Sequence, residues 1–140
     1  MRQSADAVLV DAVRRHDWHG FAARYNGLGQ VDMGPMATKR QRERFEGMIA
    51  RARQQGARVE TGGGRPAALN RGWFVEPTVL SGVTPDMDII NEEPFGPVAP
   101  ICRVKSFDEA IELANRSRYG LGGNLYSLDN DEIFRAVREI

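Results

Sequence analysis

The chain has one cysteine, no net charge and no apolar run long enough to span a membrane. One thiol excludes an intramolecular disulfide and is typical of a reducing, cytoplasmic setting. Because the 19 basic and 19 acidic residues balance, charge gives no basis for binding nucleic acid or an anionic membrane. The first residues also lack the apolar core of a signal peptide. We therefore expect a cytoplasmic location, no nucleic-acid partner and no membrane association.

Metal ligands and phosphate-binding motifs are scarce as well. His16 and His19 are three positions apart, a spacing that places two side chains on one helix face. Metal sites need further ligands, and none is nearby, so no metal is expected. The glycine run 62–64 lacks the Lys-Ser/Thr pair of a phosphate loop and continues into Arg65-Pro66. It is predicted to be a flexible turn.

The composition is that of an ordinary globular protein. The 140 residues are 41% hydrophobic and 27% charged, and this length suits one domain with a real core. The clearest helix starts at a capping box, in which Thr38 caps the Gln41 amide and Gln41 reaches back. Gly56 supplies a left-handed stop. One face of this helix is predicted to be buried, and it carries Phe45, Met48, Ile49 and Ala52.

The remaining pattern alternates between strands and helices. A strand at 73–80 is interrupted by Pro77, so it is expected to be bulged or to lie at a sheet edge. Within a strand at 98–104, Cys102 is expected to be a small, buried, unreactive side chain. Alternating strands and helices imply an α/β fold with a largely parallel, helix-covered sheet. The other predicted elements are helices at Ser4–Trp18, after Ser106 and after Asp129, a helical turn at 86–90, and strands at 57–61 and 121–126.

A stiff connector, residues 91–97, precedes the strand at 98–104. Pro94 and Pro97 fix two φ angles and remove two backbone donors, which excludes a helix interior or a central strand. An ionised carboxylate accepts two O–H donors at once, so Glu92 or Glu93 next to the Phe95 ring suits a ligand with vicinal hydroxyls and a flat ring. A nucleotide ribose with its base fits this description. Alternatively, both glutamates only solvate a loop while Phe95 fills the core.

The order and spacing of several separate motifs resemble the later part of the catalytic domain of the aldehyde dehydrogenase superfamily. The resemblance covers residues 31–140, while 1–30, a predicted helix and loop, match loosely. The last helix stops at Ile140 without a capping residue, so the chain is expected to be truncated there. The implied fold is part of a three-layer α/β/α catalytic domain. The motifs are Gly34-Pro35, Gly62-Gly63, Glu76-Pro77-Thr78-Val79, Glu92-Glu93-Pro94-Phe95-Gly96-Pro97, Glu109-Ala110, Ala114-Asn115 and Tyr119-Gly120-Leu121.

The resemblance implies a longer parent enzyme that oxidises an aldehyde to a carboxylic acid with NAD or NADP, through a cysteine thiohemiacetal. It implies that Glu93 hydrogen-bonds the nicotinamide ribose and that Phe95 contacts the same region. The expected partners are an aldehyde, the nicotinamide cofactor and further copies of the same chain, as a homo-oligomer.

The resemblance places no catalytic residue in this segment, because the family's nucleophile and base lie upstream of it. The 140-residue chain alone is therefore expected to be inactive. The alternative is a non-catalytic binding or assembly protein that retains part of the fold.

Overall fold

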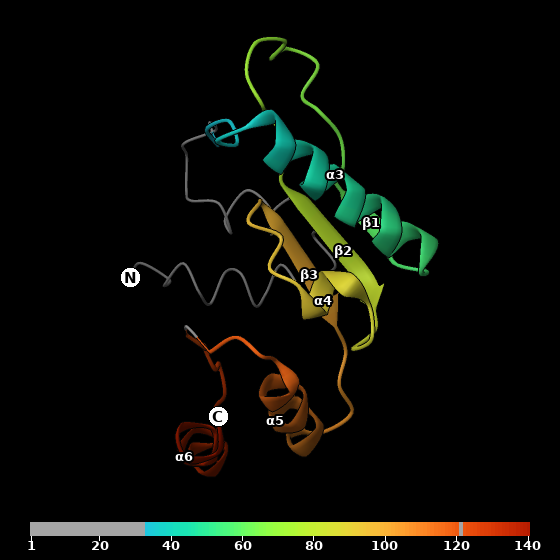
Figure 1. Ribbon diagram of the computed structural model, residues 1–140. Coiled ribbons are helices and arrows are strands. Elements are labelled where there is room, and N and C mark those ends of the chain that lie inside the picture. The colour runs from blue at the N-terminus through green and yellow to red at the C-terminus, as the bar shows by residue number, and fades with distance from the viewer. Residues whose placement is uncertain (1–32, 121) are drawn as a thin grey trace. The chain divides into compact units, whose positions relative to one another are not determined.

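The computed structural model describes residues 33–120 and 122–140 (Figure 1). The chain forms two compact units that divide after Cys102. The expected helix at Ser4–Trp18 and both histidines lie outside the described residues. No helix in the described ranges is long and apolar enough to cross a membrane. The same ranges contain no group of three potential metal ligands.

Helix α3, Lys39–Gln54, is the longest element of the first unit. The Thr38 hydroxyl accepts a hydrogen bond from the Gln41 amide at 3.1 Å, as the capping box predicts. The Gln41 side chain does not reach back to Thr38, however, and donates instead to the carbonyl oxygen of Phe95. Gly56 has a φ of 107°, so the predicted left-handed stop is confirmed. The predicted buried stripe is also confirmed: Phe45, Met48, Ile49 and Ala52.

The sheet of the first unit has three strands in the order β1-β2-β3. They are β1 (Arg58–Thr61), β2 (Thr78–Val83) and β3 (Val98–Cys102). β1 and β2 pair antiparallel, whereas β2 and β3 pair parallel. The sheet is thus mixed, which differs from the expected, largely parallel arrangement. The reason is the connection: residues 62–77 join β1 to β2 without a helix, whereas the β2–β3 crossover contains α4 (Asp88–Asn91).

Pro77 does not interrupt a strand. β2 begins at Thr78, immediately after this proline, and it is the central strand, so the expected edge position is wrong. The first residue of a strand tolerates proline because no ladder donor is lost. The glycine turn packs closely here, since a Cβ on Gly62 would lie 2.0 Å from the Pro77 oxygen. The Gly63 amide donates to the Thr78 hydroxyl at 2.9 Å, so this amide is used within the fold.

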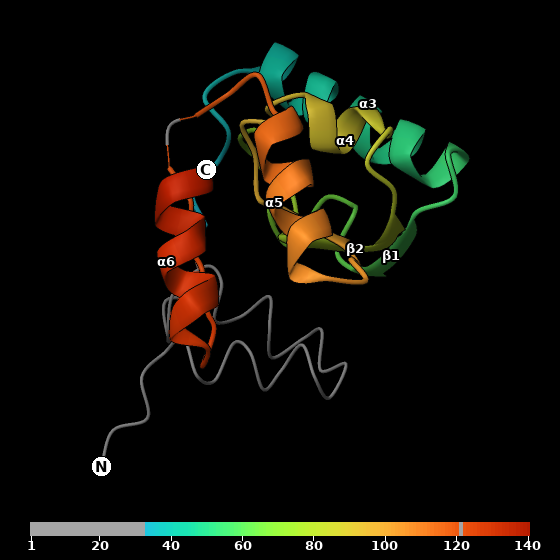
Figure 2. The ribbon, with the colours of Figure 1, turned by 90° about the horizontal axis from the view of Figure 1, so that it is seen from below.

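The core of the first unit lies between the sheet and helices α3 and α4. Figures 1 and 2 show both helices on one face of the sheet. Phe45 and Met48 of α3 and Leu80 of β2 are almost fully buried there. Ile89 anchors the short α4 in the same cluster. This core fixes α3 relative to the connector that follows α4.

The second unit contains α5 (Phe107–Arg116) and α6 (Asn130–Glu139). Ser106 and Asp129 cap these helices through their side chains, as predicted. The Asn115 side chain joins the two helices by donating to the Glu139 carbonyl at 2.6 Å. The expected strand at 121–126 is wrong for its described part, because residues 122–126 are not in a strand. A strand requires a pairing partner, and the described residues of this unit form none.

Candidate functional site

The candidate site is the connector at 91–97, which we call the Glu-Glu corner. It follows directly from α4, whose last residue, Asn91, donates to the carbonyls of Pro85 at 2.8 Å and Met87 at 3.0 Å. These two bonds close the turn before the corner. The Gly96 carbonyl at the far end accepts from the Val98 amide at 2.9 Å. Both ends of the corner are therefore fixed by local hydrogen bonds.

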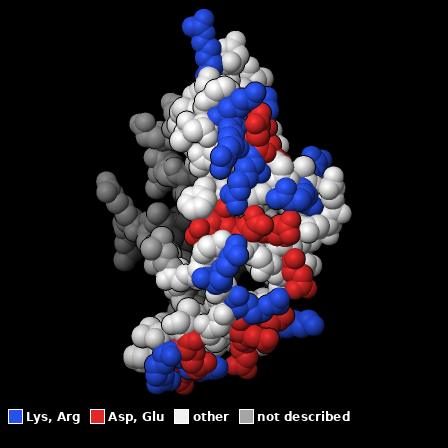
Figure 3. All heavy atoms as spheres, in the orientation of Figure 1, with Lys and Arg blue, Asp and Glu red and all other residues white. Residues whose placement is uncertain are grey.

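Helix α3 binds the α4 end of this segment through two arginines. Arg51 pairs with Asp88 of α4, with 3.0 Å between Nε and Oδ2. About two turns earlier on α3, Arg44 contacts the corner twice: its Nη2 lies 3.2 Å from Glu92 Oε2, and its Nη1 donates to the Glu93 carbonyl at 2.8 Å. Acidic side chains lie as a band beside the basic ones on this face (Figure 3). Arg44 thus holds one glutamate by its side chain and the other by its backbone.

Two further contacts with α3 hold the far end of the corner. Gln41 Nε2 donates to the Phe95 carbonyl at 3.0 Å. Gly96 packs directly on Phe45, and a Cβ at Gly96 would lie 2.3 Å from Phe45 Cδ2. Real Cβ atoms essentially never approach another heavy atom so closely, so any larger residue at this position would force Phe45 or the corner to shift.

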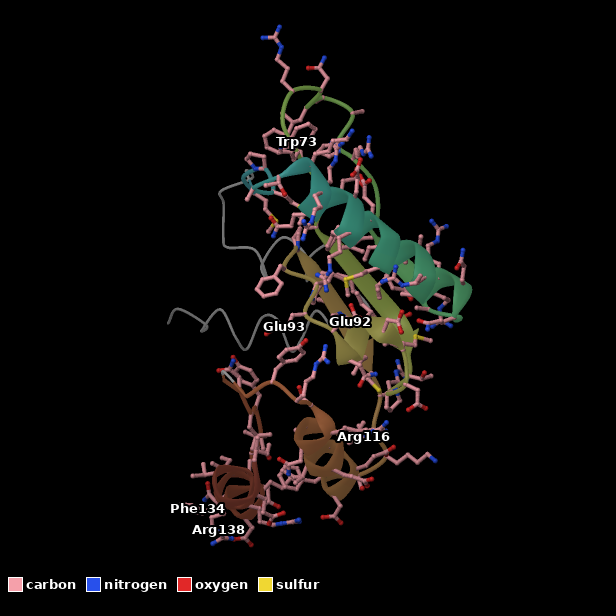
Figure 4. The ribbon with its side chains drawn as sticks, in the orientation of Figure 1. Trp73, Glu92, Glu93, Arg116, Phe134 and Arg138 are labelled. Carbon is pink, nitrogen blue, oxygen red and sulfur yellow. The ribbon has the colours of Figure 1, made fainter. Side chains whose placement is uncertain are left out.

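The two groups that α3 leaves uncommitted are the Glu93 carboxylate and the Phe95 ring. Among the residues that the structure describes, no hydrogen-bond or ion-pair partner of the Glu93 carboxylate is found, although Glu93 is partly buried. Glu92 and Glu93 lie next to each other on the corner (Figure 4). The Phe95 side chain is 66% exposed, which excludes the interpretation that it fills the core. Its φ of 45° is left-handed, a conformation rare for a residue with a bulky side chain.

Cys102 is the last residue of β3 and is only partly buried. The sequence prediction of a buried thiol is therefore wrong. The strand ends at Cys102 rather than at residue 104, and a side chain at a strand end is covered on fewer sides than one in the middle.

Sequence reasoning missed the roles of Gln41 and Arg44. It placed Gln41 in the capping box and did not single out Arg44. Their spacing held a signal, however, because Gln41, Arg44 and Phe45 stand at i, i+3 and i+4 and so share one helix face. Polar residues beside a buried stripe are well placed to contact whatever that stripe packs against.

The corner and its α3 scaffold present a carboxylate with no partner among the described residues and an exposed aromatic residue, Glu93 and Phe95. The comparison with protein families is specific: residues 23–140 match the aldehyde dehydrogenase family. The chain belongs to this family.

Curated relatives agree with this assignment. The chain is 44% identical over 108 residues to the peroxisomal aminoaldehyde dehydrogenase 2 of Malus domestica. These 108 residues are 77% of this chain and 22% of the relative. It shows the same identity and coverage with a succinate-semialdehyde dehydrogenase [NADP(+)] of Deinococcus radiodurans. The chain therefore spans about a fifth of the length of these relatives.

Solved structures share the fold. A succinate-semialdehyde dehydrogenase from Burkholderia pseudomallei matches with a TM-score of 0.78 and 36% identity, over 91% of this chain and 28% of that one. An NAD+ complex of an aldehyde dehydrogenase from Bacillus cereus matches with a TM-score of 0.77 and 34% identity, over 90% and 27%. The names of these relatives show that the family includes NAD+- and NADP+-binding members.

Proposed function

We propose that this chain supplies the nicotinamide-ribose part of the cofactor site of an NAD(P)-dependent aldehyde dehydrogenase. The Glu93 carboxylate accepts hydrogen bonds from the ribose hydroxyls, and Phe95 contacts the nicotinamide ribose region. The parent enzyme oxidises an aldehyde to a carboxylic acid through a cysteine thiohemiacetal. When bound, the cofactor supplies the hydride acceptor of this reaction.

The observation that carries the proposal is the different treatment of two adjacent glutamates. Arg44 pairs with the Glu92 carboxylate at 3.2 Å but contacts Glu93 only at its carbonyl. The Glu93 carboxylate therefore keeps its full acceptor capacity for two hydroxyl donors. Bonds from a diol to an ionised carboxylate are charge-assisted, and so are shorter and stronger than neutral ones. Phe95, two residues further along the corner, is exposed and offers apolar contact for a flat or cyclic group.

The chain's residues bind and orient rather than react. A thiohemiacetal requires a thiolate and a nearby group that accepts its proton. Cys102 sits partly buried at the end of β3, and the resemblance to the aldehyde dehydrogenase family places the nucleophile and its base upstream of this segment. We therefore expect no aldehyde turnover by this chain alone. The assay mixes the chain with NAD or NADP and a panel of aliphatic and aromatic aldehydes, and follows the absorbance of reduced cofactor.

A binding or assembly role is the alternative, and α6 gives the observation that favours it. On this helix Val137 is 78% exposed, and Phe134, labelled in Figure 4, is 63% exposed. Apolar side chains grouped on one helix face are typical of a surface that packs against another protein segment. Sedimentation of the chain with and without Val137→Asp separates this alternative from cofactor binding, because Val137 belongs to the second unit and the corner to the first.

The test of the proposed function is a nuclear magnetic resonance titration of the chain with NAD and NADP, comparing Glu93→Gln with Glu92→Gln. Glu93→Gln keeps the shape of the side chain but removes the charge that strengthens both ribose bonds. We expect it to weaken cofactor binding by about 1–3 kcal/mol. Glu92→Gln should weaken it less, since the Glu92 side chain is already committed to Arg44.

Two results would contradict the proposal. One is the absence of any saturable shift at Glu93 and Phe95 with millimolar cofactor. The other is a Glu93→Gln variant that binds the cofactor as tightly as the unmodified chain.

A further inference from the structure

We propose that Gln41 is a positioning residue that holds Phe95 in its left-handed conformation, so that the Phe95 ring and the Glu93 carboxylate face one ligand together. The role of this positioning in ligand binding rests on the proposed function. The positioning itself rests only on the contacts between α3 and the Glu-Glu corner.

Phe95 needs an external contact to keep its conformation. A φ of 45° is unfavourable for any residue with a Cβ, because that atom approaches the following carbonyl oxygen. Such conformations persist only where the surroundings determine them. The ring does not supply this restraint, because the side chain is 66% exposed. The restraint must therefore act on the backbone.

Gln41 supplies the backbone contact. Its Nε2 donates to the Phe95 carbonyl at 3.0 Å, across a separation of 54 residues in the sequence. Gln41 stands in the first turn of α3, where its own amide is held by the Thr38 cap at 3.1 Å. The donor therefore comes from a rigid element, and the peptide after Phe95 is fixed by a group that does not move with the corner.

The contact completes a series of three adjacent restraints on the corner. Arg44 donates to the Glu93 carbonyl at 2.8 Å, and the ring of Pro94 fixes the next φ angle. Gln41 then fixes the carbonyl of Phe95. Without Gln41, the third of these restraints is lost and Phe95 can relax to a negative φ. Such a change alters the direction of the Phe95 ring relative to Glu93, because the side-chain direction follows the backbone angles.

The first experiment measures the conformation of Phe95 without any ligand, in Gln41→Ala and Gln41→Glu. Backbone carbon shifts of Phe95 report its φ, and we expect both variants to move them from the left-handed to the extended range. Gln41→Glu suits the first turn of a helix and so keeps α3 formed while it removes the donor. Gln54→Ala is the matched control, because it removes the same side-chain amide from the exposed far end of α3. Left-handed shifts that persist in Gln41→Glu would overturn the inference.

The second experiment measures NAD affinity by titration of the same variants. The loss of one neutral hydrogen bond predicts an affinity about 3- to 10-fold weaker for Gln41→Glu, with Gln54→Ala unchanged. In a Phe95→Gly background, Gln41→Glu should no longer alter the affinity, since glycine adopts this conformation without strain. An equal loss in both backgrounds would mean that Gln41 does not act through Phe95.

The two proposals fail in different ways. If Glu93→Gln leaves NAD binding unchanged while Gln41→Glu still moves the Phe95 shifts, the cofactor role is wrong and the backbone role of Gln41 stands. If Glu93→Gln weakens binding but Phe95 stays left-handed in Gln41→Glu, the cofactor role stands and the positioning role is wrong.

Discussion

Gly96→Ala tests the contact between the corner and α3 most directly. A Cβ at this position would lie 2.3 Å from Cδ2 and 2.7 Å from Cε2 of Phe45. Phe45 is 2% exposed and belongs to the core, so its ring cannot move into solvent. Overpacking of a close-packed core typically costs about 1–3 kcal/mol. Gly96 does not have a positive φ, so the backbone itself accepts alanine.

The net loss of stability is therefore the overpacking penalty less a gain from the unfolded chain. Replacing glycine by alanine at a compatible φ stabilises by about 0.4–1 kcal/mol, because the unfolded chain has fewer conformations to lose. We expect Gly96→Ala to lower the free energy of unfolding by about 1–2 kcal/mol. Urea unfolding, followed by the fluorescence of Trp73 in the same unit, measures this value.

Gly34→Ala is the control for this prediction. A Cβ at Gly34 meets nothing within 4 Å, and its φ is not positive, so this variant should be as stable as the unmodified chain or slightly more stable. The loss at Gly96 should also shrink in a Phe45→Leu background, where the ring is gone. A Gly96→Ala chain that unfolds at the same urea concentration as the unmodified chain would refute the packing argument.

Three further predictions concern other parts of the first unit. The hydrogen bond from Arg65, together with its positive charge, lowers the pKa of Glu46 below the ordinary value of 4.5. The pair should therefore stabilise the fold above pH 4.5, and this stabilisation should be lost as the pH falls through the lowered pKa. Urea unfolding between neutral and acidic pH should show a smaller acid-induced loss for Arg65→Gln than for the unmodified chain, and equal losses would contradict the pairing. Thr38→Ala removes the helix cap and should destabilise by about 1 kcal/mol in urea, whereas Thr38→Ser should not. The partly buried Cys102 thiol should react with a thiol reagent in the folded chain, but more slowly than in urea, and labelling that occurs only after unfolding would show that it is buried.

The sequence alone predicted those features that depend on neighbours within a few residues. Thr38, Ser106 and Asp129 cap their helices as predicted, because each side chain bonds an amide two or three positions along the chain. The buried stripe of α3 followed from helical periodicity in the same way. The chain of separate motifs also indicated the family, since order and spacing are properties of the sequence itself.

Errors in the predicted sheet came from connections and partners that periodicity does not describe. Whether β1 and β2 run parallel or antiparallel depends on how the loop 62–77 turns, and its residues carry no periodic signal. Residues 122–126 include two glycines and an asparagine, residue types that are depleted in strands, and a strand forms only where another strand pairs with it. Cys102 was predicted as buried from its residue type, whereas its exposure depends on where β3 ends.

For the candidate site, the sequence determined which residue types the corner contains, and the tertiary structure decided what each of them contacts. Two glutamates, a phenylalanine and two prolines in seven residues already indicated a rigid, carboxylate-bearing corner. Only the fold brought Arg44 to Glu92 across 48 residues, and Gln41 to Phe95 across 54. These contacts commit Glu92, leave the Glu93 carboxylate unpaired among the described residues and turn Phe95 outward. Their physical origin is the burial of Phe45 and Met48, which fixes α3 on the sheet and thereby places its polar neighbours against the corner.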